Sequence, residues 1–508
     1  MPGSNMCSIL PGRFTLKLLC AALCFGLAGT SRGLDEGLIA STVAAKSFID
    51  EFGLKANYLS TAEQANRQSN VTTMVTIGCL PGALIAFFWS ERIGMLWAMR
   101  QACVAWIVGC IIFLTSHTIG QVYAGRLVMG MGIGQFSVLA PVYLGEIAPR
   151  DMRGILIGLF GMSEYLGIMT GYFSIWGASI HISNSSPKQW IIPHSVQIMW
   201  AGMLLIFSVF CEESPRYMCR KGRRDTAAKT LGKLWGLSAF DPVIQDEINS
   251  ARRQLELEHG CSSARSFFGT LKNLFTGKEN LQRIAFIFTL QCLIQWSGPT
   301  SMTTYAPRLF ALFGINGQSQ TLFTTAIFGA VKFASALGSA LFMIDLLGRR
   351  RTLYIGLTTQ LVAFIYCAVF LTIFATLSET TQEAPAAKHA AIGAVAMIYL
   401  IGVAWALGWN SIQYIITAEI FPLHVRIAGS SLVTIWHYGN RMGISKAVPT
   451  MLLEHGSLSP KGTFWFFTAI TAVGMVYTWI FLPETAKKGL EETGDLYSTG
   501  RIYSEERK

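Results

Sequence analysis

Apolar residues along this chain fall into long runs that shorter polar segments separate. Twelve runs reach the length of about 20 predominantly apolar residues that a helix needs to cross a bilayer. They lie near 16–41, 68–89, 95–115, 119–143, 154–177, 195–211, 283–312, 321–345, 352–376, 389–417, 427–453 and 463–482. A polar segment with helical periodicity from Asp246 to Leu257 lies between the sixth and seventh runs. The pattern predicts twelve membrane-spanning helices in two sets of six.

The composition supports a membrane protein. Of the 508 residues, 52% are hydrophobic and only 14% are charged, whereas soluble domains carry about 25% charged residues. In the first run, Lys17 precedes an apolar stretch, as in a signal peptide. The run continues to Ile39 and carries charges, however, so we expect a membrane-spanning helix. We therefore predict an all-α polytopic membrane protein. Its expected parts are an N-terminal segment 1–15, a bundle 16–212, a central segment 213–282, a bundle 283–482 and a tail 483–508.

The net charge of +11 fits a membrane topology better than nucleic-acid binding. Most of the 40 lysines and arginines lie inside if both termini and the central segment are cytoplasmic, as the positive-inside rule requires. No basic run is interleaved with stacking aromatic residues, so we expect no nucleic-acid partner. In this orientation Asn184-Ser185-Ser186 forms a glycosylation sequon in an external loop.

Residue types that carry catalysis or bind metals are not grouped in this sequence. The eleven cysteines form no CxxC pair and no Cys/His cluster, and His437 is the one histidine clearly within a span. Gly130, Gly132 and Gly134 precede no phosphate-binding lysine, so we interpret them as sites of close helix packing. We expect no metal, no cofactor and no enzymatic activity.

Three short motifs occur once in each half of the chain at similar shifts. Glu146-Ile147-Ala148-Pro149 with Arg153 corresponds to Glu419-Ile420-Phe421-Pro422 with Arg426. Glu213-Ser214 corresponds to Glu484-Thr485, and Glu91-Arg92-Ile93-Gly94 corresponds to Asp345-Leu346-Leu347-Gly348. Parallel repeats of six spans are typical of transporters in which two bundles rock about a central site.

These motifs resemble the sugar-porter family of the major facilitator superfamily over nearly all of the chain. The resemblance rests on Gly125-Arg126, Pro141-Val142-Tyr143, Glu213-Ser214-Pro215-Arg216-Tyr217 and Pro483-Glu484-Thr485 together with the repeated motifs above. Gln295-Trp296-Ser297-Gly298 and Gly329-Ala330-Val331-Lys332 are similar to the fungal quinate-type permeases. The resemblance implies a major facilitator fold and transport of a small polyhydroxylated molecule.

Charged residues at the cytoplasmic helix ends are expected to form a gate that joins the two bundles when the site faces outward. Individual exposed pairs contribute about 1 kcal/mol or less, but several together can bias a two-state equilibrium. The alternative is that they are solvated loop charges. The gate candidates are Glu91, Arg92, Glu146, Arg153, Glu213, Arg216, Asp345, Arg349, Glu419, Arg426 and Glu484.

Charges inside the spans are the sharper signal, because a buried charge is expensive unless it is paired. Asp35 and Glu36 lie late in the first span, and Arg126 lies early in the fourth. The resemblance implies that Asp35 and Arg126 interact and that protonation of Asp35 is coupled to transport. Arg32 precedes Asp35 by three residues, so a purely structural triad of Arg32, Asp35 and Arg126 is the alternative.

A substrate site is expected between the bundles. Gln291 and Gln295 share one face of the seventh span, and amides both donate to and accept from hydroxyl groups. Gln295 matches a sugar-binding glutamine of the family. Other positions depart from the family pattern, which puts an ordinary hexose site in doubt. The remaining candidates are Thr300, Glu164, Asn410 and Tyr414.

Lys332 stands in the eighth span where the family has an asparagine. A lysine at this depth needs a counter-charge, and Arg441 and Lys446 in the eleventh span add further positive charge. A substrate carboxylate would supply the counter-charge, which favours an anionic polyol such as quinate. The alternatives are that Lys332 pairs with Glu164 or extends to an interface.

The sequence therefore favours a proton-coupled importer of a sugar or a quinate-type polyol acid that works by alternating access. We expect a monomer that spans the plasma membrane, with the lipid bilayer and a polyhydroxylated substrate as its partners. The alternatives are an uncoupled sugar facilitator and a non-transporting nutrient sensor of the same fold. Proton-dependent uptake separates the first from the symporter, and signalling without flux identifies the second.

Overall fold

The structure, a computed structural model, is helical in the residues that it describes. These are residues 15–43, 45–54, 60–149, 152–259, 269, 274–275, 278–315, 317–343, 347–374, 385–421, 425–453 and 458–483. The first half contains α1 (Leu16–Gly26), η2 (Leu27–Gly29), α2 (Thr30–Thr42), α3 (Lys46–Glu51), α4 (Thr61–Ile93), α5 (Met95–Leu114), α6 (Ile119–Ile147), α7 (Arg153–His181) and α8 (Lys188–Ser208).

The central segment contains three helices and the second half contains the rest. The central helices are α9 (Pro215–Arg220), α10 (Arg224–Trp235) and α11 (Pro242–His259), and α11 confirms the helix expected from Asp246 to Leu257. The second half consists of α13 (Lys278–Trp296), α14 (Pro299–Thr304), α15 (Ala306–Leu312), α16 (Gln318–Gly338), η4 (Ser339–Met343), α18 (Arg349–Phe374), α20 (Pro385–Trp405), η5 (Ala406–Asn410), α21 (Ser411–Glu419), α22 (Arg426–Met451) and α23 (Ser459–Phe481).

Nine helices in the described part of the chain are long and apolar enough to cross a membrane. The other three predicted runs are also helical, but they are interrupted or polar. The first is divided among α1, η2 and α2, the seventh among α13, α14 and α15, and the eleventh is α22, which carries Arg441 and Lys446. The apolar pattern thus located these helices, although buried charges and breaks lower the apolar character of three of them.

The break in the seventh run has a local cause. Gly298 separates α13 from α14 with φ at 100°, a backbone conformation that residues with a side chain rarely adopt. Pro299 follows at the first position of α14, where its missing N–H group costs no helical hydrogen bond. Phe467 of α23 packs against the break, 2.6 Å from the position that a Cβ atom on Gly298 would take.

Helices of the first half pack closely where glycines face a neighbouring backbone. A Cβ atom on Gly130 of α6 would lie 2.1 Å from the Val75 carbonyl oxygen of α4, and one on Gly78 would lie 2.1 Å from the Leu127 carbonyl oxygen. Gly134 repeats this contact against Cys79, with 2.4 Å to its carbonyl oxygen. These contacts confirm helix packing as the role of this glycine series.

We expect Gly130→Ala to destabilise the protein, because its methyl group has no space between α6 and α4. Overpacking of this kind costs about 1–3 kcal/mol or more. Gly177→Ala on α7 is the matched control, since nothing lies within 4 Å of the position that its Cβ atom would take. The melting temperature of the detergent-solubilised protein measures the effect. Equal melting temperatures for the two variants would contradict the close packing of α4 and α6.

The two halves meet along two pairs of helices. α4 packs against α22, and α7 packs against α16. Buried apolar residues form one cluster mainly within the first half and a second mainly within the second half. Less extensive contacts join α14 to α2, and α21 to α6 and α7. They bring interrupted helices to the interface between the halves. Polar side chains on these helices therefore meet at the centre of the molecule.

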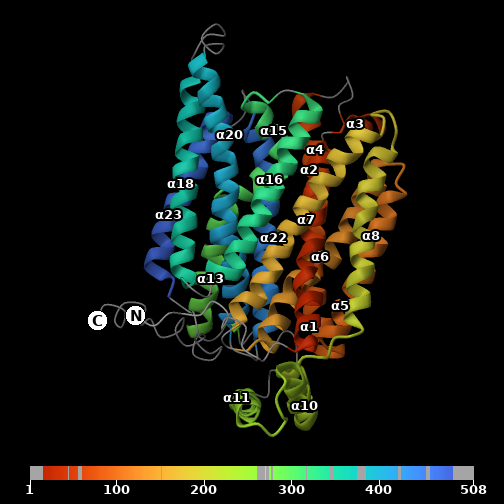
Figure 1. Ribbon diagram of the computed structural model, residues 1–508, viewed down its shortest axis with the longest axis vertical. Coiled ribbons are helices and arrows are strands. Elements are labelled where there is room, and N and C mark those ends of the chain that lie inside the picture. The colour runs from red at the N-terminus through yellow and green to blue at the C-terminus, as the bar shows by residue number, and fades with distance from the viewer. Residues whose placement is uncertain are drawn as a thin grey trace.

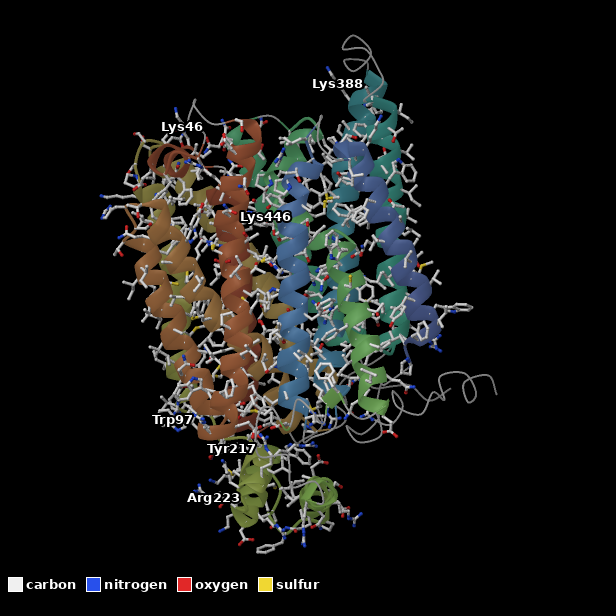
Figure 2. All side chains as sticks on the ribbon, turned by 180° about the vertical axis from the view of Figure 1, so that it is seen from behind. Lys46, Trp97, Tyr217, Arg223, Lys388 and Lys446 are labelled. Atoms are coloured by element: carbon white, nitrogen blue, oxygen red, sulfur yellow. The ribbon has the colours of Figure 1, made fainter. Side chains whose placement is uncertain are left out.

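Figure 1 shows the helices of both halves running side by side, with α10 and α11 beneath one end of the bundle and α3 and α15 at the other. We refer to these as the α10 end and the α15 end. Figure 2 shows Tyr217 and Arg223 at the α10 end and Lys46 and Lys388 at the α15 end. The central segment packs below the first half: Trp235 Nε1 donates to the Ile147 carbonyl at 2.9 Å.

Candidate functional site

Seven charged side chains are buried where the two halves meet. Each is no more than 6% exposed, so each depends on protein partners rather than on water. They come from α2, α6, α7, α16 and α22, that is, from both halves. The seven are Arg32, Asp35, Glu36, Arg126, Glu164, Lys332 and Arg441.

Asp35 and Arg126 form a bidentate ion pair within the first half. Arg126 Nη1 donates to Asp35 Oδ1 at 3.0 Å, and Nη2 donates to Oδ2 at 3.1 Å. Arg126 Nε donates to the Val71 carbonyl of α4 at 2.5 Å. The carboxylate and guanidinium planes match in this geometry, which makes such pairs stronger than single hydrogen bonds. Both carboxylate oxygens of Asp35 are therefore hydrogen-bonded to Arg126.

Arg32 contacts residues of α7 and α21 rather than Asp35. Its Nε lies 3.2 Å from Glu164 Oε1, and its Nη1 donates to the Tyr414 hydroxyl. The Tyr414 hydroxyl donates in turn to Glu164 Oε2 at 3.0 Å, and the Arg32 guanidinium lies over the Tyr438 ring at 5.6 Å. Arg32 and Glu164 therefore connect the first half to Tyr414 and Tyr438 of the second half.

Glu36 joins the halves through a second ion pair. Arg441 Nη2 of α22 contacts Glu36 Oε1, and Arg32 Nε lies 3.6 Å from the same oxygen. Arg441 is thus paired with a protein carboxylate. Lys446, five residues further along α22, is exposed and donates to Asn70 Oδ1 of α4, so it does not share the buried site of Arg441. Figure 2 shows Lys446 on α22.

Lys332 is 1% exposed and, among the described residues, has no carboxylate within ion-pair distance. Its Nζ donates to Thr303 Oγ1 at 2.5 Å. The same atom lies 4.6 Å from the ring centre of Tyr165 and 5.1 Å from that of Phe328. Ring faces attract a cation. Glu164 is engaged by Arg32 and Tyr414, so Lys332 is held by a hydroxyl and two rings.

The two glutamines of α13 converge on a histidine of α22. Gln291 Oε1 lies 2.9 Å from His437 Nδ1, and Gln295 Nε2 lies 3.2 Å from the same nitrogen. His437 Nε2 and Gln295 Oε1 are buried without a hydrogen-bond partner. The sequence marked His437 as a histidine within a span, but no spacing rule related it to the glutamines, because they belong to different helices.

Thr300 and Asn410 are buried near the same interface. Asn410 Nδ2 donates to the Gly161 carbonyl of α7 at 2.7 Å, while its Oδ1 is buried without a partner. Thr300 is 4% exposed on α14 and its carbonyl accepts from Thr304. Gly161 and Glu164 both face the second half, as the three-residue spacing on α7 predicts. The expected substrate-site residues therefore gather at the interface.

Two small cavities lie on either side of Arg32 and Tyr438. We call one the inner cavity; Gln291, Tyr414 and His437 line it. We call the other the middle cavity; Asp35, Glu36 and Arg441 line it. Arg32 and Tyr438 line both. Each has a volume of about 20 Å³, enough for about one water molecule. The centre of this structure is therefore closed around its own side chains.

A third cavity, the vestibule, opens at the α15 end and measures about 600 Å³. Tyr305 lies in its wall and separates it from the middle cavity. The Tyr305 hydroxyl donates to the Ser445 carbonyl at 2.7 Å and lies 3.5 Å from Thr72 Oγ1, and both of these residues line the middle cavity.

The gate candidates of the first half gather at the α10 end. Arg220 donates to Glu91, Tyr217 Oη donates to the Arg92 carbonyl at 3.2 Å, and Ser214 Oγ donates to Glu146. These bonds tie the central helix α9 to the ends of α4 and α6. Each joins the first half to the central segment rather than to the second half.

Glu213 caps the start of α5. Its carboxylate accepts from the N–H groups of Met95 at 3.0 Å and Leu96 at 3.2 Å, where a helix attracts negative charge. Burial raises the pKa of Glu213, although these N–H groups act in the opposite direction. Met95 and Leu96 thus contribute backbone N–H groups to this contact.

The other gate candidates divide between described and undescribed positions. Arg349 Nη1 donates to Glu419 Oε2 at 2.8 Å within the second half, and Arg216 Nη2 donates to Glu247 of α11 at 2.8 Å. Arg426 Nε donates to the Phe421 carbonyl at 3.2 Å, and Arg153 is buried at the start of α7. Asp345 and Glu484 lie outside the described residues.

Among the residues with described positions, no group of three or more His, Cys, Asp or Glu side chains converges. The cysteines that the structure places are all unpaired, and seven of these nine are buried. The site is thus built from ion pairs, amides, hydroxyl groups and aromatic rings, which can bind and release a small polar molecule.

The chain is similar to transporters in sequence. The profile of the family described as "Sugar (and other) transporter" matches residues 21–497. A protein named "Probable quinate permease" from Neosartorya fischeri is 29% identical over 481 residues, covering 93% of this chain and 85% of the relative. The quinate permease of Neurospora africana is 28% identical over 492 residues, covering 96% of this chain and 89% of the relative.

Solved structures with the same fold include a proton:xylose symporter, XylE, bound to 6-bromo-6-deoxy-D-glucose. It matches with a TM-score of 0.79 at 20% identity and covers 95% of this chain and 99% of its own. The inward-open form of the Escherichia coli xylose transporter matches with a TM-score of 0.69 at 20% identity, covering 94% of this chain and 99% of its own. The relatives are transporters rather than enzymes. The chain is therefore a multi-pass membrane protein of the major facilitator superfamily and belongs to its sugar transporter family.

Proposed function

We propose that this transporter imports a polyhydroxylated carboxylate of the quinate type together with a proton. The observation that carries the proposal is the buried Lys332, which has a hydroxyl and two rings as neighbours and no carboxylate within ion-pair distance in the described part of the chain. A carboxylate on the substrate would supply the partner that the protein does not.

The balance of buried charge supports an anionic substrate. Among the seven buried charged residues, cations outnumber carboxylates by four to three. The cations are Arg32, Arg126, Lys332 and Arg441, and the carboxylates are Asp35, Glu36 and Glu164. Ion pairs account for all three carboxylates, with Arg126, Arg441 and Arg32. One positive charge is therefore in excess when all seven groups are ionised. Burying an uncompensated charge is costly, so an anion bound at the centre gains a favourable partner.

Hydroxyl recognition is assigned to the inner cavity. Gln291 and His437 line it, and the unpartnered His437 Nε2 can exchange a hydrogen bond with a substrate hydroxyl. Gln295 Oε1 and Asn410 Oδ1 are further buried acceptors without partners. Buried polar groups that lack partners favour a ligand that supplies them. Tyr414 and Arg32 would have to move apart to admit a substrate the size of quinate.

Proton coupling is assigned to Asp35 and Arg126, with Glu36 as a neighbouring carboxylate. Desolvation favours the neutral form of a carboxyl group, and a paired guanidinium favours the charged form. Motion that separates Asp35 from Arg126 would therefore allow Asp35 to take up a proton. Arg32 does not compete for Asp35 in this structure, since it contacts Glu164 and Glu36. This arrangement favours coupling over a structural triad with Arg32.

The orientation follows from charge. We assign the α10 end, where the basic central segment lies, to the cytoplasm, and the α15 end to the outside of the plasma membrane. Asn184 then lies on the outer side; its Oδ1 accepts from Gln189 Nε2 at 2.8 Å in the exposed loop between α7 and α8. The two ends of the chain are cytoplasmic in this orientation, and a monomer suffices, since both halves of the site belong to one chain.

Uptake of radiolabelled quinate and glucose into transporter-deficient cells at acidic and neutral outside pH tests the proposal. We expect quinate uptake that rises as the outside pH falls, and little glucose uptake. Glucose uptake without quinate uptake would overturn the anionic substrate and return Lys332 to a structural role. Quinate uptake that does not depend on the outside pH would identify an uncoupled facilitator. A signalling response without flux of substrate would identify a sensor.

A further inference from the structure

The vestibule has the size and lining of a binding site in its own right. Its volume of about 600 Å³ is in the range of small-molecule sites. Both halves contribute to it: α2 and α4 from the first, α15, α16 and α22 from the second. Its polar lining residues are Ser41, Gln64, Gln68, Tyr305, Arg308, Gln318 and Thr321.

Arg308 is the cation of the vestibule. It is half-buried on α15, in the wall of the cavity. No described carboxylate forms an ion pair or a hydrogen bond with it, whereas the described arginines of the central site are all paired. A guanidinium that is partly removed from water and faces a cavity without a protein counter-charge favours an anion from solution. Its planar donors match a carboxylate in two-point geometry.

Neighbouring groups add to this preference. The 21-residue helix α16 begins at Gln318 in the vestibule wall. Its N-cap residue is Gly317, which has no side chain to accept from the first N–H groups of the helix. The N–H groups at such a helix start carry partial positive charge. Gln68 and Ser41 line the cavity from the first half and can bond to hydroxyl groups. The vestibule thus combines a cation with hydroxyl-binding groups, the same two chemistries as the central site.

We propose that the vestibule is a capture site for the carboxylate of the transported polyol acid, with Arg308 as the residue that binds the carboxylate. This inference rests on the proposed function. Tyr305 closes the floor of the vestibule through its bonds to Ser445 and Thr72, so an anion held at Arg308 waits outside the middle cavity until Tyr305 moves. Passage inward then transfers the carboxylate from Arg308 to Lys332.

A capture site changes the rate of encounter more than the rate of the transport cycle. A cation in a cavity raises the local concentration of an anion and its rate of association, and salt weakens this effect. Removing Arg308 should therefore raise KM and leave kcat nearly unchanged. It should also reduce the dependence of kcat/KM on ionic strength, which loss of a merely structural residue would not do.

The test measures initial rates of radiolabelled quinate uptake by full-length wild-type and variant proteins in transporter-deficient cells. Ionic strength is varied at constant osmolarity with sorbitol. For Arg308→Gln we expect KM to rise about five- to tenfold, kcat to stay within about twofold, and the salt dependence to flatten. Arg308→Lys should keep most of the salt dependence. Lys46→Gln, an exposed charge at the same end on α3, is the matched control and should behave as wild type.

A second variant guards against misfolding of Arg308→Gln. Gln318 is exposed at the start of α16, where a glutamate is favourable for the helix, so Gln318→Glu should fold and yet repel an anion from the vestibule. We expect it to raise KM for quinate as well. Wild-type KM and salt dependence in both variants, or a fall in kcat without a change in KM, would overturn the capture site. Absence of quinate uptake by the wild type would instead overturn the proposed function.

Discussion

Lys332→Gln is expected to lower kcat/KM for quinate by about two to three and a half orders of magnitude. In the proposed site the lysine supplies the counter-charge of the substrate carboxylate. Loss of one partner of a buried charge pair costs about 3–5 kcal/mol, and 1.4 kcal/mol corresponds to a factor of ten. The fold should persist, because the glutamine amide can still donate to Thr303 Oγ1, the present partner of Lys332 Nζ. Initial rates of quinate uptake, normalised to the amount of protein at the cell surface, measure the effect.

Charge and position are separated by two control variants. Lys332→Arg keeps the positive charge and should retain more activity than Lys332→Gln, although the larger guanidinium must fit between Tyr165 and Phe328. Lys388→Gln removes an exposed lysine at the α15 end (Figure 2) and should leave uptake unchanged. If Lys332→Gln transports quinate with the wild-type KM, the carboxylate does not bind Lys332 and the charge excess has a structural explanation.

Asp35→Asn is expected to abolish proton-driven accumulation of quinate while it preserves exchange of labelled for unlabelled quinate across the membrane. Asparagine has the shape of aspartate but cannot carry the coupled proton. One proton with one monovalent anion makes the cycle electroneutral, so each unit of pH gradient can drive at most about a tenfold accumulation, and the membrane potential should have no effect. Accumulation at an imposed pH gradient and counterflow at equal pH are the two measurements.

The same variant distinguishes coupling from structure. Asp35→Asn leaves Arg126 buried without its bidentate partner, which costs stability, so the melting temperature is recorded alongside the fluxes. Asp50→Asn on the exposed face of α3 is the matched control and should change neither flux. Loss of exchange together with accumulation, in a protein that still folds, would indicate that the pair is needed for the transport cycle itself. pH-driven accumulation that survives in Asp35→Asn would exclude Asp35 as the proton carrier.

Much of the architecture could be predicted from the chain alone. The apolar runs located the spanning helices, and the glycines of the fourth run predicted close helix packing, although not that α4 is the partner of α6. Hydropathy over about 20 residues is a local property that the bilayer selects directly, and a glycine permits close approach whatever its distant neighbour is. The apolar pattern predicted helix continuity least well at the first and seventh runs. There, η2 and Gly298 interrupt the helices beside the central site.

The partners of the buried charges were harder to predict. The spacing of Arg32 and Asp35 suggested a contact, but Arg32 contacts Glu164 and Tyr414, which lie far away in sequence. The contact of Arg441 with Glu36 had no signal in the sequence, and neither did the contacts of His437 with Gln291 and Gln295. The interaction between charges falls with distance and with screening by the surroundings, so a small rotation of one helix changes which pair forms.

The sequence by itself determined that this protein crosses the membrane many times, that its halves repeat, and that charged and amide side chains lie within its spans. These features follow from composition and from short-range spacing, which do not depend on how the helices are packed. Only the tertiary structure decided that the three buried carboxylates form ion pairs with three arginines. It also decided that Lys332 contacts Thr303 and two aromatic rings instead. That outcome depends on the relative rotation and depth of helices from both halves, because a buried charge is stabilised only by groups within a few ångströms of it.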